Sequence, residues 1–217
     1  MKYFCLAVFI LSSVIHLYAS IKCNKKLRAW TKGFILPGLI GWYVLSVPEP
    51  SGILIAALIT SWLGDVLLIP HGTKWFAAGG MGFLASHICF VLAYLPGVDF
   101  GAGSPWLLVP VAAVYVTAVF LVMNHLKNDL KGALFFGMSV YLLINATMNF
   151  FAFGRLLTAP GLSTVLTFVG AVLFFTSDSI LFHVRFKKDT RIKTHFSVML
   201  TYILSELLIV SGFMLTA

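Results

Sequence analysis

Two aspartates lie inside otherwise apolar stretches of this chain and are its clearest candidates for chemistry. Asp65 lies within residues 61–68 and Asp178 within residues 174–181. A carboxylate at the centre of a bilayer costs about 2.5–3.5 kcal/mol on insertion scales. A membrane protein keeps such residues where they face a partner, a cavity or a reaction. The pair therefore indicates proton chemistry inside a membrane protein.

The composition excludes a soluble domain. The chain has 217 residues, of which 60% are hydrophobic and 10% charged, and its mean hydropathy is +0.99. Soluble domains carry about 25% charged residues. Because the cysteines are odd in number and scattered, at Cys5, Cys23 and Cys89, we expect no disulfide framework and no CxxC site. The length suits a single domain over residues 1–217.

The hydrophobic pattern predicts an all-α integral membrane protein, an eight-helix transmembrane bundle. About 20 apolar residues span a bilayer. The expected spans are residues 3–20, 31–47, 53–69, 75–95, 105–124, 131–153, 161–184 and 196–215. The connections between them are short and carry proline and glycine, as at residues 47–52 and 96–105.

The basic residues orient the bundle. Thirteen of the 15 follow odd-numbered spans: Lys22, Lys25, Lys26, Arg28, Lys32, Lys74, Lys127, Lys131, Arg185, Lys187, Lys188, Arg191 and Lys193. The other two are Lys2 and Arg155. By the positive-inside rule, the odd connections are cytoplasmic and both termini lie outside, across the inner membrane in a bacterium. The basic residues thus report topology and attract anionic lipid, not nucleic acid.

The same charge pattern argues that the first apolar run is a span and not a cleaved leader. Only Lys2 precedes the run, whereas five basic residues follow it. A secretory leader has the opposite balance.

The orientation places several polar residues at related depths. Asp65 lies about one turn, and Asp178 about one and a half turns, from the cytoplasmic end of its span. Lys32 lies in the first turn of its span, on the same side. Nearer the midplane come His87 and Glu206. The two carboxylates are therefore expected in one layer.

Helical spacing also indicates which polar residues share one face of their helix. Tyr141, Asn145 and Asn149 follow one another at intervals of four, and Tyr202 and Glu206 are one turn apart. Such stripes face the bundle interior, since lipid offers no hydrogen-bond partners. We expect one cavity, open toward the cytoplasmic leaflet, to be lined by Asp65, Asp178, Asn145 and Glu206, with His87 at its wall. Alternatively, the histidine and the asparagines only join helices, and Lys32 only reaches the interface.

A similarity between a few residues of the two halves suggests a 4+4 parallel repeat, in which each half contains four spans. Lys32-Gly33 opens the second span and Lys131-Gly132 the sixth, while Asp65 with Leu68 resembles Asp178 with Leu181. Two halves in the same orientation would be related by an axis along the membrane normal. The two aspartates would then be symmetry mates facing a common centre.

At these residues the chain resembles the YhhN-type lysoplasmalogenase family. The matching elements run in order from residue 31 to about 212: Thr31-Lys32, Gly64-Asp65 with Leu68, residues 83–87, residues 170–178, and Thr201-Tyr202 with Gly212. Two positions depart from the family pattern. Glu206 stands where the family usually has glutamine, and Gly33 replaces the proline that commonly follows the lysine.

The resemblance implies hydrolysis of the vinyl ether bond of lysoplasmalogen to a fatty aldehyde and a glycerophospho-alcohol. One carboxyl would protonate the vinyl carbon and one carboxylate would steady the positive charge, as in glycosidases. We therefore expect Asp65 and Asp178 to be catalytic, with no cofactor or metal. The lysophospholipid substrate would be bound, within the surrounding membrane lipids, by Lys32, His87, Tyr141, Asn145, Tyr202 and Glu206. Lys32 would bind the phosphate group of this lipid.

Two other classes of function use the same residues. A small proton-coupled transporter or lipid-handling protein would use the acids as a proton relay. A metal-dependent membrane hydrolase would use Asp65, Asp178 and His87 as ligands, although no paired-histidine spacing accompanies them. The sequence leaves open the headgroup preference, the role of Glu206, the oligomeric state and which aspartate is the general acid.

Overall fold

The computed structural model describes residues 1–101, 105–130, 132–187 and 195–216, and these residues form eight α-helices and no strand. The helices are α1 (Lys2–Ile21), α2 (Lys25–Ser46), α3 (Gly52–Leu67), α4 (Thr73–Tyr94), α5 (Leu108–Leu126), α6 (Gly132–Thr158), α7 (Leu162–Phe186) and α8 (Phe196–Met214). Short 3-10 turns at Leu95–Gly97 and Pro105–Leu107 flank the connection from α4 to α5. The predicted all-helical fold is confirmed for this part of the chain.

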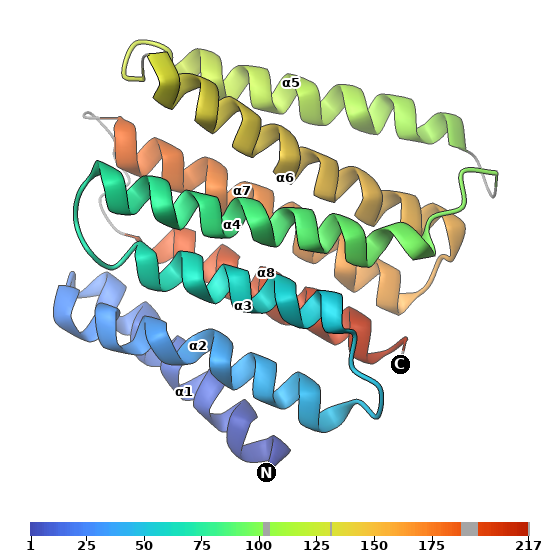
Figure 1. Cartoon of the computed structure of the whole chain (residues 1–217), viewed down its shortest axis with the longest axis horizontal. Coiled ribbons are helices and arrows are strands. Elements are labelled where there is room, and N and C mark those ends of the chain that lie inside the picture. Colours follow the sequence, from blue (N-terminus) through green and yellow to red (C-terminus); the bar gives the residue numbers. More distant parts are fainter. Residues whose placement is uncertain (102–104, 131, 188–194, 217) are drawn as a thin grey trace.

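The helices run antiparallel in chain order, as Figure 1 shows. The turns from α1 to α2, α3 to α4 and α5 to α6 lie at one end of the bundle, which we call the basic end. Both termini lie at the opposite end. The basic end carries nine of the described basic residues, while Lys131, Lys188, Arg191 and Lys193 lie outside the described residues. The predicted alternation of the basic residues is confirmed for the described part of the chain.

Six of the eight helices are long and apolar enough to cross a membrane: α1, α4, α5, α6, α7 and α8. Helix α3 is apolar but shorter, with 16 residues. Helix α2 begins at Lys25, six residues before the predicted start at residue 31. The prediction was wrong there because the basic segment continues the helix, with the Asn24 side chain capping it by accepting from Leu27 N at 3.1 Å.

Glycines allow close approach between the helices that carry the aspartates and their neighbours. A Cβ atom on Gly82 of α4 would lie 2.8 Å from the backbone nitrogen of Gly64 in α3. A Cβ atom on Gly170 of α7 would lie 2.9 Å from the carbonyl oxygen of Ser205 in α8. Helices without side chains at the contact can pack backbone against backbone. The pairs α3–α4 and α7–α8 therefore hold the aspartate-bearing helices in fixed register.

The outer helices pack differently in the two halves of the chain. Helix α1 packs along α2, whereas α5 packs less extensively on α6 and lies at the edge of the bundle (Figure 1). The 4+4 repeat stays a prediction.

Candidate active site

A cavity of about 370 Å³ opens at the basic end of the bundle. It lies among the first turns of α2, the last turns of α3 and α7, and the start of α8. Asp65 and Asp178 both line it, although only 1% and 4% of their surfaces are exposed. The two carboxylates that the sequence placed in one layer therefore share one cavity.

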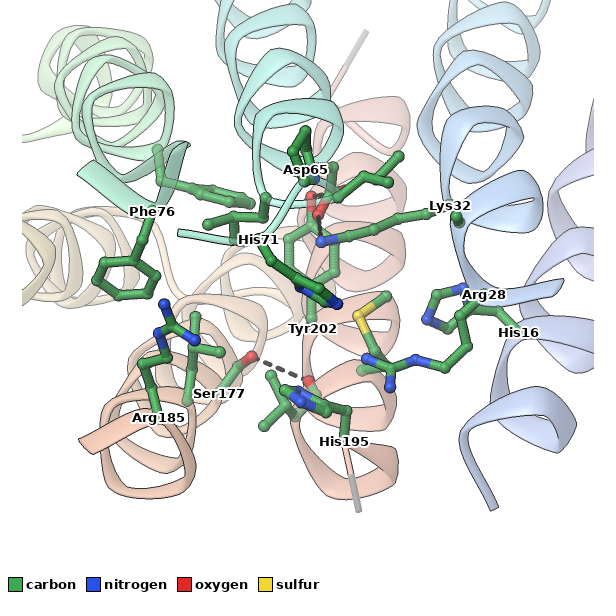
Figure 2. A pocket seen from close by; sticks show the side chains of 18 of the residues that line it. His16, Arg28, Lys32, Asp65, His71, Phe76, Ser177, Arg185, His195 and Tyr202 are labelled. Atoms are coloured by element: carbon green, nitrogen blue, oxygen red, sulfur yellow. Dashed lines mark hydrogen bonds and ion pairs between the residues drawn. The ribbon is translucent and has the colours of Figure 1, made fainter. Parts of the chain in front are cut away.

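Asp65 has a partner for each carboxyl oxygen. Lys32 Nζ lies 3.0 Å from Asp65 Oδ1. The Tyr202 hydroxyl donates to Asp65 Oδ2 at 2.9 Å. Both partners also line the cavity, and Figure 2 shows Lys32 extending from α2 toward Asp65. A carboxyl that accepts at both oxygens, once from a cation, has the environment of an ionised carboxylate.

Among the described residues, Asp178 is bonded through one carboxyl oxygen only. Its Oδ2 accepts from the Tyr141 hydroxyl at 2.7 Å and from Asn145 Nδ2 at 2.7 Å, and His87 Nε2 lies 3.1 Å away. Asp178 Oδ1 has no hydrogen-bond partner among the described residues. Since the three residues around Oδ2 do not line the cavity and Asp178 does, Oδ1 is the oxygen left to face it.

A hydrogen-bonded chain orients the amide that contacts Asp178. Asn149 Nδ2 donates to Asn145 Oδ1 at 3.1 Å, and the Tyr115 hydroxyl donates to Asn149 Oδ1 at 2.8 Å. Each member thus donates toward Asp178, from α5 through α6 to α7. The predicted interior stripe of Tyr141, Asn145 and Asn149 is confirmed, and all three side chains are buried.

The expected lining of the cavity needs correction. Asn145, Glu206 and His87 do not line it, and neither does Tyr141. Asn145, His87 and Tyr141 lie behind Asp178, whose Oδ2 they contact. Glu206 lies one turn of α8 beyond Tyr202 and is fully buried. Neither of its carboxyl oxygens has a hydrogen-bond partner in the described part of the chain.

Aromatic rings separate this inner layer from the cavity. Phe83 and Tyr202 line the cavity and pack edge to face, with centroids 5.8 Å apart. Phe174 packs against Tyr202 at 5.4 Å and against His87 at 4.7 Å. These rings explain why residues that were expected, from their depth in the membrane, to line the cavity are instead buried.

Sequence reasoning missed the positive charge around the cavity mouth. Besides Lys32, the lining includes Lys25, Arg28 and Arg185, with the histidines His16, His71 and His195. Lys25, Arg28 and Lys32 are spaced i, i+3 and i+7, which is one face of a helix. The spacing could have indicated this charged face, but the predicted span begins only at residue 31, whereas α2 begins at Lys25.

The charges at the mouth act on His195, which lies just before α8. Burial, and then the charges of Arg28, Lys32 and Arg185, lower the pKa of His195 from 6.5 to about 4. This histidine is therefore neutral near pH 7, and the positive charge at the mouth comes from lysine and arginine.

The described residues contain no group of three or more histidine, cysteine, aspartate or glutamate side chains placed to hold a metal ion. The set Asp65, Asp178 and His87, considered above as ligands, does not form such a group. His87 Nε2 and Asp178 contact one another directly.

The comparisons with known proteins point to one family. The model of the YhhN family matches residues 27–213. Two curated relatives, each named lysoplasmalogenase, come from Mycobacterium bovis and Mycobacterium tuberculosis. Each is 34% identical to this chain over 161 residues, which cover 74% of this chain and 59% of the relative. The chain therefore matches less than two thirds of each relative's length. No solved structure matches the chain.

Proposed function

This chain belongs to the YhhN family, and we propose that it is a multi-pass membrane hydrolase that cleaves the vinyl ether bond of lysoplasmalogens. The products would be a fatty aldehyde and a glycerophospho-alcohol. The observation that carries the proposal is the pairing of two buried carboxyls in one cavity with different hydrogen-bond environments. The lysoplasmalogenase names of the two relatives agree with it.

The two environments support different roles for the two aspartates. Asp65 faces a lysine cation and accepts at both oxygens, so it is the carboxylate. In the described part of the chain, Asp178 accepts only at Oδ2, as the carbonyl oxygen of a protonated carboxyl would, and Oδ1 would carry a proton toward the cavity. Enzymes commonly keep one of two acids protonated and the other ionised by placing them in different surroundings. Asp178 is therefore the general acid.

The reaction begins with transfer of the Asp178 proton to the β-carbon of the vinyl ether. The carbon–carbon double bond breaks, a new C–H bond forms, and the positive charge is shared between the ether oxygen and its carbon. Asp178 is left as a carboxylate. The anionic Asp65 stabilises the cation and orients water, as the second carboxylate of a glycosidase does.

Water then attacks the oxocarbenium carbon, and its proton returns to Asp178. The resulting hemiacetal then breaks its C–O bond to glycerol as its hydroxyl forms the aldehyde carbonyl, and the hydroxyl proton passes to the departing glycerol oxygen. No net proton is consumed, so the acid is restored for the next turnover. His87, Tyr141 and Asn145 would position Asp178 in this scheme and would not touch the substrate.

The cavity also suits the physical form of the substrate. It combines apolar side chains such as Leu68, Phe76 and Leu181 with a cationic mouth at the basic end. A single-chain lipid entering there would place its headgroup-proximal bond beside the acids. By the positive-inside rule, this mouth would open toward the cytoplasmic leaflet, with both termini on the other side.

The direct test is release of aldehyde from a defined lysoplasmalogen by the purified full-length chain. We expect release with the vinyl ether lipid and none with its saturated alkyl ether analogue, because only the vinyl carbon can be protonated. Substrate flux into sealed vesicles without aldehyde would instead favour a transporter that uses the same acids. Activity lost on chelation and restored by a metal would favour the metal-dependent alternative.

A further inference from the structure

Three cations at the cavity mouth have no described anionic partner. Lys25 and Arg28 come from the first turn of α2, and Arg185 comes from the last turn of α7. Of the four cations that line the cavity, only Lys32 has a carboxylate within 4.0 Å in the described part of the chain. Lys32 is thus engaged with Asp65, while the charges of the other three remain available to a ligand.

Of these three cations, Arg28 is the one most clearly available to a ligand. It is half-buried, and its Nε is enclosed without a hydrogen-bond partner among the described residues. An enclosed donor of this kind loses its bound water and is unfavourable unless another group accepts from it. Arg28 is therefore positioned for an acceptor that the protein itself does not supply.

Arg185 faces the same space from the opposite wall. Its guanidinium carbon lies 5.3 Å from the centroid of the Phe76 ring, a cation–π contact that restricts the side chain. In Figure 2, Arg28 and Arg185 extend from opposite sides of the pocket, with His71 and His195 between them in this view. The charges of both arginines reach His195, as the lowered pKa of that residue indicates.

We propose that Arg28 and Arg185, assisted by Lys25, bind the phosphate group of a single-chain phospholipid at the mouth of this cavity. The proposal rests on the proposed function for the identity of the lipid. Planar guanidinium groups bind phosphate oxygens in pairs, with geometry that an ammonium group does not provide. Lys32, expected from the sequence to bind the phosphate, instead contacts Asp65 Oδ1 at 3.0 Å.

This arrangement explains how the reactive bond would reach the acids. The phosphate would be held at the mouth, and the glycerol would extend inward. The ether oxygen on the far glycerol carbon would then lie beside Asp65 and Asp178, and the hydrocarbon chain would follow the apolar wall. Binding energy from a remote group would in this way fix the position of the bond to be cleaved.

The proposal can be tested by binding alone, with a lipid that cannot react. The probe is a saturated 1-O-alkyl lysophospholipid, and affinity is measured by calorimetry with the full chain in detergent micelles. Arg28→Gln and Arg185→Gln should each weaken binding about ten- to hundredfold, the usual effect of losing a hydrogen bond to a charged group. Arg28→Lys, which keeps the charge but loses the paired donors, should fall between wild type and Arg28→Gln.

Two controls separate phosphate recognition from damage to the fold. A 1-O-alkylglycerol has the same chain and glycerol without phosphate, so its affinity should be equal in wild type and both glutamine variants. Lys127→Gln removes an exposed cation at the same end that does not line the cavity, and it should leave both affinities unchanged. Unaltered phospholipid binding in both arginine variants would overturn the proposal.

A third measurement identifies the source of the phosphate. Inorganic phosphate should compete with the phospholipid only weakly in wild type. If it binds as tightly as the lipid, the site belongs to free phosphate and the lipid assignment is wrong. Because the probe is not hydrolysed, absence of aldehyde release from lysoplasmalogen would overturn the enzyme function while leaving arginine-dependent phospholipid binding to stand.

Discussion

Lys32 Nζ lies 3.0 Å from Asp65 Oδ1, and this ion pair joins the second turn of α2 to the last turn of α3. The pair is mostly buried, with 14% of the lysine side chain and 2% of the aspartate side chain exposed. Removing one partner of a buried pair leaves the other charge without compensation. The contribution of this ion pair to stability can therefore be measured separately from its contribution to turnover.

Lys32→Met should lower both stability and turnover. We expect a loss of about 3–5 kcal/mol, the usual cost of breaking a buried pair, measured as thermal unfolding of the purified protein. The double variant Lys32→Met with Asp65→Asn removes both charges, so it should recover most of the stability but none of the aldehyde release. Stability equal to wild type in the single variant would show that the pair contributes nothing.

Each of the two aspartates should be required for full turnover. Asp65→Asn and Asp178→Asn are nearly isosteric and should fold, yet each should reduce turnover about 10²–10⁴-fold, the range of general acid–base catalysis. Glu206→Gln serves as the matched control, since Glu206 is equally buried but lies outside the cavity. It should keep most activity. An inactive glutamine variant beside active asparagine variants would transfer the chemistry to Glu206.

Tyr141 should act on the rate and not on substrate binding. Tyr141→Phe removes one of the donors to Asp178 Oδ2 without altering the cavity wall. A hydrogen bond of about 1–1.5 kcal/mol corresponds to about a tenfold change in rate. We expect kcat to fall by that factor while KM is unchanged, and the alkaline limb of the pH–rate profile, which reports loss of the proton from the general acid, to move. Ser139→Ala, on the same helix but bonded only to the carbonyl of Phe135, should change neither.

His195 should make stability depend on pH in the mildly acidic range. Its pKa in the folded protein is about 4, below the ordinary value of 6.5, so the unfolded chain binds the proton more readily. Stability is unaffected by this group above about pH 6.5 and falls as the pH drops from there toward 4. Unfolding midpoints of wild type and His195→Gln, compared between pH 7.5 and 4.5, should diverge as the pH is lowered. Parallel curves would contradict the assignment.

The membrane orientation can be read by labelling introduced cysteines after Cys5, Cys23 and Cys89 are replaced. Cysteines at residues 26 and 190 should react from the cytoplasmic side, and those at residues 99 and 157 from the opposite side. Residue 190 lies outside the described residues, whereas the other three lie at the ends of the bundle that the alternation predicts. Cytoplasmic labelling at residue 99 would overturn the orientation.

The sequence by itself determined the helices, their alternation and the shared layer of the two aspartates. Apolar windows separated by proline and glycine produce one helix each, because in lipid every backbone group must be bonded within its own segment. Placing Asp65 and Asp178 at one depth required only the direction of each helix and the rise per residue. The helical period also identified the buried face that carries Tyr141, Asn145 and Asn149.

Only the tertiary structure decided which of these polar residues meet the cavity and which stand behind it. Depth and face are properties of one helix, whereas the cavity depends on how the helices rotate and approach one another, as at Gly64 against Gly82. Asn145 lies behind Asp178, and Glu206 lies one turn of α8 beyond Tyr202, so neither lines the cavity. Conversely, Arg28 reaches the mouth because α2 continues through its basic segment to the cap at Asn24.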